Sequence, residues 1–387
     1  LVQKSFAVTK SQVAVLEPFK DLSIAVVSFL ITSYITKIGY RRAMLIALGF
    51  TAAVCFVMPF TKSLVAIELL FAAIGSSFAL IKMSAFGSIG LITKDEKSHI
   101  SFMNFLEAFF GMGVVVSYFI FPLFIDKNNP GSSSWLNVYY LLGGISLVAF
   151  LLLLVSPLDE TEAKAGNDAA SLEDFVKMFR LLVVPLVLIF IACAFLYVLL
   201  EQSIMSWLPT FNNDVLKLNE VLSIQMASIL AASIAAGRFL AGFIMKKVKW
   251  ITVLIACLVL AGGLVYFAMP VIQKVVASYK GSGITSFKDI PAVAFVFPLI
   301  GLVLAPVYPA INSVILSSLP KPQHGLMSGL IILFSALGGS TGSVITGNIF
   351  QHYGGQTAFY FSLLPIALLI ICLIIFNRLH NKKAAGV

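Results

Sequence analysis

Residues 136–155, with the sequence LNVYYLLGGISLVAFLLLLV, contain no charged side chain. As an α-helix this stretch would extend about 30 Å, the thickness of the hydrocarbon core of a bilayer. Mostly apolar runs of similar length recur along the chain at 13–35, 43–60, 65–91, 98–125, 182–207, 221–245, 250–270, 292–317, 323–348 and 355–376. They are too long for the alternating strands of a membrane barrel, so the sequence predicts an all-α membrane protein with eleven spans.

The composition supports a lipid environment for most of the chain. Of the 387 residues, 59% are hydrophobic and 11% are charged, and the mean hydropathy is +1.01. An ordinary soluble domain has roughly a quarter of its residues charged, so a soluble enzyme or nucleic-acid module is excluded. The net charge of +9 comes from short basic clusters between the apolar runs, which predicts a lipid bilayer and not nucleic acid as the partner.

The basic loops predict the orientation of the chain. If the loop after the first apolar run is cytoplasmic, most lysines and arginines between spans fall on that side. We therefore expect a plasma membrane protein of the bacterial inner-membrane type with a cytoplasmic C-terminus. The sequence starts without Met, and residues 1–12 resemble an outer loop that follows a helix. We expect one earlier span, which would make twelve.

An internal repeat predicts two bundles. The polar stretch 156–181, with six acids and three bases, is interpreted as a solvated cytoplasmic linker between an N-terminal bundle at 1–155 and a C-terminal bundle at 182–387. A shift of 224 residues aligns Met103, Leu106 and Phe110 with Met327, Leu330 and Phe334. Together with the expected earlier span, spans two to six would form one six-helix bundle, and spans seven to twelve would form its pseudo-symmetric partner, a recurrent plan of transporters.

Several short motifs resemble one transporter family. The segment Ile35-Thr-Lys-Ile-Gly-Tyr-Arg-Arg-Ala-Met-Leu45 resembles the loop signature Gly-x-x-x-Asp-Arg-x-Gly-Arg-Arg of the major facilitator superfamily, with Thr36 in place of the usual acid. Gly237-Arg-Phe-Leu-Ala-Gly242 resembles its second copy. The motifs Glu201-x-Ser-x-x-x-Trp-Leu-Pro-Thr-Phe211 and Pro306-Val-Tyr-Pro-Ala-Ile-Asn312 resemble the branch of the fucose–proton and glucose/galactose symporters. The resemblance implies alternating access around a midplane cavity and a gating loop that contains Lys37, Gly39, Arg41, Arg42 and Arg238.

Charged residues inside the apolar runs are the candidate functional residues, because each costs about 2.5–3.5 kcal/mol to insert. Lys82 and Glu107 lie at similar depths in consecutive spans, about 13–14 Å from one surface, so they are predicted to pair. The pair is either a structural link between two helices or a switch in which protonation of Glu107 releases Lys82 for a substrate.

Three further charges share one helical face in the first apolar run. Glu17, Lys20 and Asp21 are spaced at i, i+3 and i+4, which predicts that the two acids take part in proton coupling and that Lys20 contacts substrate. Alternatively, the span begins near residue 22 and the three residues lie in an outer vestibule. Glu201 is interpreted either as a substrate ligand or as a residue facing outer water, and Arg238 is close enough to its helix end to snorkel.

The resemblance adds candidate substrate contacts. An Asn-x-x-Gln-x-x-Asn pattern of the fucose-symporter branch is similar to residues 104–110, which implies that Asn104 and Glu107 contact substrate; Glu107 and Phe110 depart from the pattern. Lys82 lies near the position of that branch's fourth-helix acid, and a lysine there suits a carboxylate or phosphate.

Two prolines and a set of glycines mark the last spans. Pro306 and Pro309 interrupt one span, so the flanking Tyr308 and Asn312 are predicted substrate-binding residues, unless the break is only a kink. The next span contains many glycines, which predicts that a neighbouring helix packs closely against it. They are Gly325, Gly329, Gly338, Gly339, Gly342 and Gly347.

The chain lacks a P-loop and the motifs of membrane enzymes, which argues against ATP-driven pumping or catalysis, and we expect no cofactor and no metal. The sequence therefore predicts a monomeric secondary transporter for a small-molecule substrate, a sugar or an organic anion. Coupling is expected to protons, with Glu107 as the preferred acid, although sodium is possible. A drug or amphiphile exporter is the alternative within this class, and a channel or non-transporting receptor is the alternative outside it.

Overall fold

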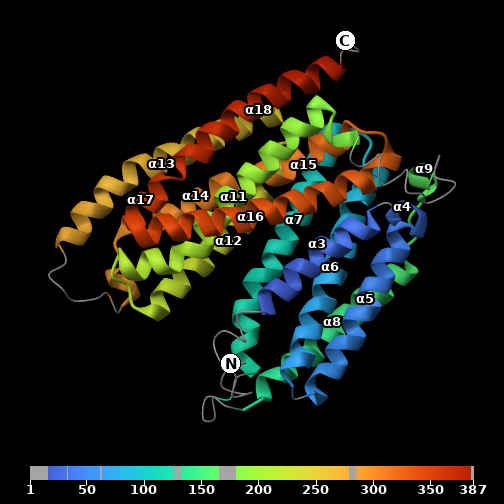
Figure 1. The fold of residues 1–387 in the computed structure, drawn as a ribbon, viewed down its shortest axis with the longest axis horizontal. Helices are drawn as coiled ribbons and strands as arrows, with labels where there is room; N and C mark the ends of the chain where they lie inside the picture. The colour runs from blue at the N-terminus through green and yellow to red at the C-terminus, as the bar shows by residue number, and fades with distance from the viewer. Residues whose placement is uncertain are drawn as a thin grey trace. The chain divides into compact units, whose positions relative to one another are not determined.

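The computed structural model describes residues 16–32, 34–61, 63–124, 126, 132–164, 180–278, 284 and 286–384. These residues are almost entirely helical, as Figure 1 shows. The exception is an isolated parallel bridge between Leu218 and Ile284, which joins the loops before α12 and before η4. The predicted all-α class is confirmed.

The helices follow the apolar runs of the sequence. Those before residue 165 are α3 (Leu16–Ile31), α4 (Ile35–Ile38), α5 (Tyr40–Val57), α6 (Leu64–Ile92), α7 (Glu96–Ile120), α8 (Val138–Val155) and α9 (Thr161–Lys164). Those after residue 180 are α11 (Pro185–Asp214), α12 (Glu220–Ile244), α13 (Trp250–Ser278), α14 (Val296–Leu304), α15 (Val307–Ser317), α16 (His324–Tyr353), α17 (Gly355–Tyr360) and α18 (Leu363–Ala384). Short 3-10 turns lie between them: η1 (Met58–Phe60), η2 (Phe121–Phe124), η3 (Ser134–Asn137), η4 (Phe287–Asp289), η5 (Ala292–Phe295) and η6 (Lys321–Gln323).

Ten helical segments of the described residues are long and apolar enough to cross a membrane. They correspond to ten of the eleven predicted spans. The remaining prediction, at 13–35, coincides with α3, whose apolar part, Leu22–Ile31, is shorter than a full span. The helix begins at Leu16, but its apolar part begins at Leu22, where the alternative interpretation of this run placed the start of the span.

The contacts divide the chain into two compact units. The first contains Leu1–Lys94, Val116–Arg180 and Leu319–Leu333, and the second contains Asp95–Val115, Leu181–Ser318 and Phe334–Val387. Most of α7 therefore belongs to the second unit, and the beginning of α16 belongs to the first. The division into bundles at 1–155 and 182–387 stays a prediction.

In the first unit, α6 is the central helix. It packs against α3 on one side and α5 on another, and α5 also packs against α8. At one end of these helices, Met58, Ile67, Leu70, Trp135 and Leu136 form a buried apolar cluster. This cluster fixes the turns η1 and η3 against α6 and so sets the helix ends in register.

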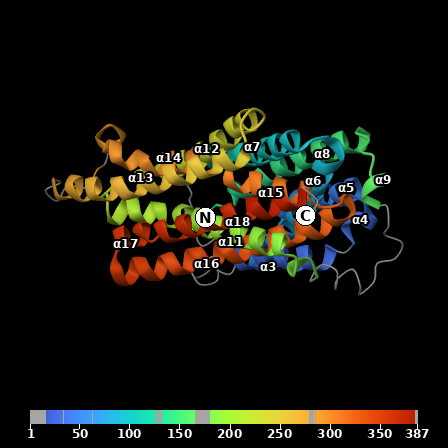
Figure 2. The same cartoon turned by 90° about the horizontal axis from the view of Figure 1, so that it is seen from above.

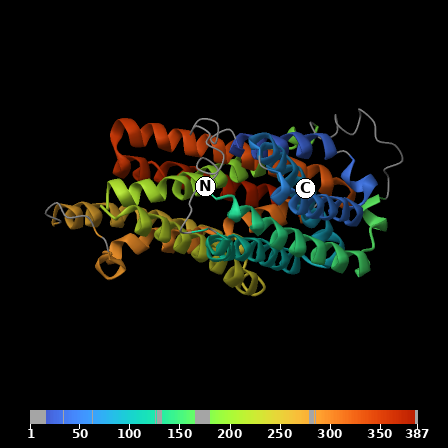
Figure 3. The ribbon, with the colours of Figure 1, turned by 90° about the horizontal axis from the view of Figure 1, so that it is seen from below.

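In the second unit, α11 is the central helix. It packs against α12, α15 and α18, and α13 packs against α14 and α18. Figures 2 and 3 show α11 between the α12–α14 layer and the second half of α16. The helix α14 ends at Leu304 and α15 begins at Val307, so the break expected at Pro306 is present. Asn219 starts α12 as its N-cap, accepting the backbone N–H of Leu222 at 2.8 Å.

Glycines allow α16 to approach α11 backbone to backbone. A Cβ added at Gly338 would lie 2.5 Å from the carbonyl oxygen of Phe195, and one at Gly342 would lie 2.3 Å from that of Leu199. Only glycine fits at such distances, because the obstructing atoms are main-chain atoms that cannot rotate away. The predicted close approach along this helix is confirmed at these two positions.

Candidate functional site

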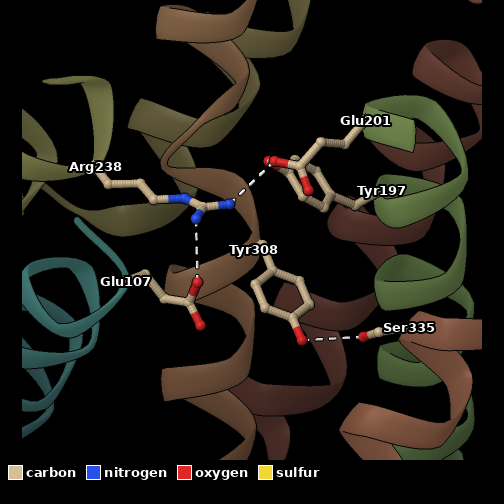
Figure 4. Close-up of polar contacts among 6 residues, drawn as sticks. All are labelled: Glu107, Tyr197, Glu201, Arg238, Tyr308 and Ser335. Atoms are coloured by element: carbon tan, nitrogen blue, oxygen red, sulfur yellow. Dashed lines mark hydrogen bonds and ion pairs between the residues drawn. The ribbon is translucent and has the colours of Figure 1, made fainter. Parts of the chain in front are cut away.

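The interior of the second unit contains two carboxylates that share one guanidinium (Figure 4). Arg238 of α12 donates from one terminal nitrogen to Oε2 of Glu107 on α7, at 3.1 Å, and from the other to Oε1 of Glu201 on α11, at 3.0 Å. Only 7% of Arg238 and 2% of Glu107 are exposed. We refer to Glu107, Glu201 and Arg238 as the acid–arginine cluster. It links three helices that are far apart in the sequence.

Two stacked tyrosines extend this cluster (Figure 4). The hydroxyl of Tyr197 donates to Oε1 of Glu201 at 2.9 Å, so this oxygen accepts from both Tyr197 and Arg238. The ring of Tyr197 stacks on Tyr308 of α15, with centroids 5.8 Å apart and planes inclined by 23°. The hydroxyl of Tyr308 lies 3.0 Å from Oγ of Ser335 on α16. The contacts therefore continue from the cluster to two more helices.

Small residues bring α7 and α12 close enough for the pair between Glu107 and Arg238. A Cβ at Gly111 would lie 3.0 Å from that of Ala235, one turn before Arg238 on α12. On the other side of the pair, the hydroxyl of Ser101 donates to the carbonyl oxygen of Gly242 at 2.6 Å. The two helices thus touch on both sides of the ion pair, which is held in a tight apolar interface.

The acid–arginine cluster is buried, so its charges carry a desolvation cost. Moving charges out of water costs several kcal/mol for each ion, and a buried ion pair is weak evidence for a stabilising role. A second carboxylate on the same guanidinium adds like-charge repulsion at short range. Buried ionisable groups inside a membrane span are functional candidates by default, and the acid–arginine cluster is the strongest candidate in the described residues.

The space beside the cluster is small. A cavity of about 10 Å³ lies next to Tyr197 and Glu201, with Ile204, Leu230 and Leu304 in its wall. That volume suffices for roughly one water molecule and not for a solute. The described residues contain no group of three or more His, Cys, Asp or Glu side chains that could hold a metal ion.

Some buried polar atoms near this site have no hydrogen-bond partner in the part of the chain that the structure describes. They include Nε of Arg238, Oδ1 of Asn104 and both amide atoms of Asn312. Asn104 lies one helical turn before Glu107 on α7, and Asn312 lies one turn after Tyr308 on α15. Buried polar groups normally have a hydrogen-bond partner. These protein atoms are therefore available to bind a water molecule or a substrate.

The structure locates the other predicted site residues in the first unit. The ammonium of Lys82 on α6 lies 5.5 Å from the ring centroid of Phe78 and 5.4 Å from that of Phe86, within cation–π range. Lys82 and Glu107 belong to different compact units, and their predicted pairing stays a prediction. Lys20 is half-buried on α3, where its carbonyl oxygen meets Gly75 of α6. The backbone of Glu17 and Asp21 belongs to α3, but their side chains lie outside the described part of the structure.

The predicted gating loop has a fixed local geometry. Gly39 has φ 90°, a conformation that favours glycine, between α4 (with Lys37 in its last turn) and α5. The side chain of Arg41 donates to carbonyl oxygens of Leu153, Leu154 and Ser156 at the end of α8, whereas Arg42 is exposed. Arg238, grouped with these residues in the sequence-based prediction, instead lies inside α12 in the acid–arginine cluster.

One interpretation of the linker was wrong. Glu160 was expected to be a solvated acid, but it is only 8% exposed, and its Oε1 accepts the backbone N–H of Arg41 at 2.6 Å. The first N–H groups of a helix lack intrahelical partners, so a carboxylate is stabilised at the start of α5. The acid is therefore buried by a specific partner that the composition of the linker does not reveal.

Sequence reasoning also missed three features of the site. It did not identify Tyr197 or Ser335, and it assigned Glu107 to Lys82 without considering Arg238. A signal for Tyr197 exists, because it precedes Glu201 by four residues and therefore shares its helical face. The pairing of Glu107 with Arg238 has no comparable local signal, since the two residues are 131 positions apart.

Comparison with known proteins identifies the family. The family model of the Major Facilitator Superfamily matches residues 2–287 and 275–386, nearly the whole chain. The chain therefore belongs to the major facilitator superfamily, whose members are membrane transporters of small molecules. It is a multi-pass integral membrane protein. No curated protein matches the chain at a significant level.

Solved structures agree with this assignment at the level of the fold. The chain resembles the transporter FucP in its outward conformation, with a TM-score of 0.78 and 14% identity over 97% of this chain and 92% of that one. An alanine variant of the E. coli fucose:proton symporter FucP gives 0.76 and 15% over 97% and 93%. The human organic anion transporter MFSD10 gives 0.63 and 15% over 93% and 82%. The predicted resemblance to the fucose-symporter branch is confirmed at the level of the fold.

Proposed function

We propose that this protein is a proton-coupled secondary transporter for a small polar solute, a sugar or an organic anion. The observation that carries the proposal is the acid–arginine cluster, in which Glu107 and Glu201 bind different terminal nitrogens of one buried guanidinium. Two of the similar structures are those of a fucose:proton symporter and an organic anion transporter, which supports both solute classes. A bacterial inner-membrane location, a cytoplasmic C-terminus and a monomeric state remain part of the proposal.

The proposed coupling depends on how protonation of Glu107 or Glu201 changes the strength of its bond to Arg238. An ionised carboxylate binds the guanidinium strongly, and a protonated one binds it weakly. Protonation of one acid therefore weakens one of the links that join α12 to α7 and α11. A proton that binds one conformation better than another shifts the equilibrium between them, and alternating access requires such a shift.

Substitution of Glu107 tests the proposal in reconstituted vesicles. If Glu107 is the coupling acid, Glu107→Gln should abolish accumulation driven by an inward proton gradient and should spare exchange of solute across the membrane, because an amide cannot cycle a proton. If Glu201 is the coupling acid, Glu201→Gln should have this effect instead. Glu96→Gln, at the start of the same helix, is the control and should accumulate solute normally. Unimpaired accumulation by Glu107→Gln would remove this acid from the coupling mechanism.

The same assay separates the proposal from its alternatives. The substrate is first identified by a thermal-shift screen of sugars, uronates, amino acids and phosphates on purified protein, since a ligand of the native state raises the melting temperature. Concentrative uptake that collapses with a protonophore is expected of a coupled transporter. Uptake that only equilibrates the solute indicates a channel, and net extrusion of amphiphiles indicates an exporter.

A further inference from the structure

The two carboxylates on Arg238 are not equivalent. The side chain of Glu107 is 3% exposed and lies in the tight interface between α7 and α12, whereas that of Glu201 is 17% exposed and lines the small cavity beside α11. A side chain next to a cavity can change its position more easily than one enclosed by close-packed helices. Of the two acids, Glu201 is the one that can leave Arg238 and be replaced.

Glu201 also has a second anchor. The hydroxyl of Tyr197 donates to the same Oε1 that binds Arg238, and Tyr197 is held by its stacking on Tyr308. If Glu201 leaves the guanidinium, it keeps a hydrogen bond to Tyr197 one turn away on the same helix. A protonated carboxyl keeps such a bond because it both donates and accepts.

Arg238 has donors to offer an incoming anion. Both terminal nitrogens carry bonds to carboxylates, and Nε, although buried, has no hydrogen-bond partner among the described residues. Nε and the terminal nitrogen on the same edge of the guanidinium form a fork of two donors. Such a fork binds both oxygens of a carboxylate through two parallel hydrogen bonds. A carboxylate that takes the place of Glu201 would be held more completely than Glu201 is.

We propose that the substrate is a small monocarboxylate that replaces Glu201 on Arg238, and that Glu201 takes up the proton transported with it. This inference rests on the proposed function and specifies its substrate class and stoichiometry. In the binding step the substrate remains R–COO⁻, and the Glu201 carboxylate gains one H⁺ from the side on which the substrate enters. The cluster gains one negative and one positive charge, so its net charge is unchanged. One anion and one proton cross together, and transport is electroneutral.

The surroundings of the cluster are consistent with this exchange. Among the described residues of the second unit, Tyr197 on α11 and Tyr308 on α15 are titratable side chains that lie beside the cluster. The helix α14, which packs on α12, has no titratable residue. Lys246, near the end of α12, is exposed and lies against Phe105. The small cavity implies that the anion enters only in an opened conformation, as alternating access requires.

Asn104, one helical turn before Glu107 on α7, has one buried acceptor atom that is available to a substrate hydroxyl. Its Oδ1 has no partner among the described residues, while its nitrogen donates to the carbonyl oxygen of Ile100 at 2.9 Å. The free position is therefore an acceptor, which suits a hydroxyl group and not a second carboxylate. A sugar acid carries both the carboxylate for Arg238 and hydroxyls for such an acceptor.

Transport of matched solutes tests the inference. Purified protein in proteoliposomes is given radiolabelled glucuronate or glucose, galacturonate or galactose, and lactate or propane-1,2-diol, which differ within each pair by the carboxylate. We expect an acid to accumulate under an inward proton gradient and not under a valinomycin-induced potassium potential. Preference for the neutral members, or accumulation driven by the potential alone, overturns the inference but leaves a coupled transporter. Accumulation of none of the six under either gradient counts against the proposed function as well.

Variants identify the acid. Binding of the transported acid by wild-type protein should be about tenfold or more tighter at pH 5.5 than at pH 7.5, because one proton is taken up for each anion bound. Glu201→Gln should bind equally at both pH values and retain exchange, whereas Asp214→Asn, at the exposed end of the same helix, should behave as wild type. Arg238→Lys should lose about tenfold or more in affinity at both pH values, since lysine lacks the fork.

The inference is overturned if Glu201→Gln keeps the pH dependence of the wild type, or if Glu107→Gln alone abolishes it. Correct folding of each variant is checked by its elution on size exclusion and by its melting temperature. A variant that fails these checks is replaced by Tyr197→Phe, which removes the second anchor of Glu201 and should shift the pH dependence without removing Arg238.

Discussion

The close contact between α11 and α16 leads to a prediction whose size follows from the structure. Gly342→Ala would put a Cβ 2.3 Å from the carbonyl oxygen of Leu199 and 2.9 Å from its carbonyl carbon and Cα. These are backbone atoms, so the two helices must separate by about 1 Å to restore an ordinary contact. Overpacking of this kind costs about 1–3 kcal/mol, and the better helix propensity of alanine recovers up to about 1 kcal/mol.

We therefore expect Gly342→Ala to lower the free energy of unfolding by about 1–2 kcal/mol. The melting temperature in detergent, followed by tryptophan fluorescence at one scan rate, should fall by about 2–6 °C. The control is Gly263→Ala on α13, where nothing lies within 4 Å of the added Cβ; it should be neutral or stabilising.

A double variant sharpens this test. Gly338→Ala forces the same separation of the same helices, so the double variant should cost less than the sum of the two single variants. A melting temperature for Gly342→Ala at or above that of Gly263→Ala would refute the backbone-to-backbone contact. Strict additivity of the two substitutions would refute the shared displacement.

Three smaller effects are expected, each measurable as a melting temperature. Gly39→Ala should cost about 1–2 kcal/mol, because an alanine at φ 90° is strained; no change would contradict this backbone geometry. Hydrogen bonds from Ser98 lower the pKa of Asp95, so the advantage of wild type over Asp95→Asn should be present at neutral pH and shrink as the pH falls below about 4. Tyr197→Phe should cost about 1 kcal/mol by removing one hydrogen bond to Glu201 while retaining the ring, and a larger loss would indicate a packing defect.

The spans were predictable from the sequence because their cause is local. Each needs enough consecutive apolar residues to cross the hydrocarbon core, and the run at 136–155 satisfies this requirement without reference to any other part of the chain. The break at Pro306 is equally local, since proline removes a backbone donor and clashes with the preceding turn. The span predicted at 13–35 is the exception, because Lys20 and Asp21 interrupt the apolar run and leave an apolar part, Leu22–Ile31, that is shorter than a full span.

The partners of the charged residues were not predictable in the same way. Depth within a span follows from counting residues, and on that basis Lys82 and Glu107 were paired. Depth does not give the direction of a side chain around its helix or the neighbour that it faces. The approach of α7 to α12 depends on small residues such as Gly111 and Ala235, whose effect becomes visible only when the two helices are placed together. Glu160 was misinterpreted for a similar reason, since its burial depends on the helix start at Arg41.

The shared guanidinium also constrains how proton and substrate influence each other. If a substrate carboxylate and Glu201 compete for the same nitrogens of Arg238, protonation of Glu201 removes the competitor and raises the affinity for the anion. Thermodynamic linkage then requires the bound anion to raise the affinity of Glu201 for a proton by the same factor. The coupling needs no pathway between distant sites, because both ligands act on one side chain. Glu107 keeps α12 joined to α7 during the exchange, so the positive charge is never left without an anionic partner. Arg238 can therefore couple the flux of protons to the flux of substrate by exchanging its ion pair with Glu201 while it keeps its ion pair with Glu107.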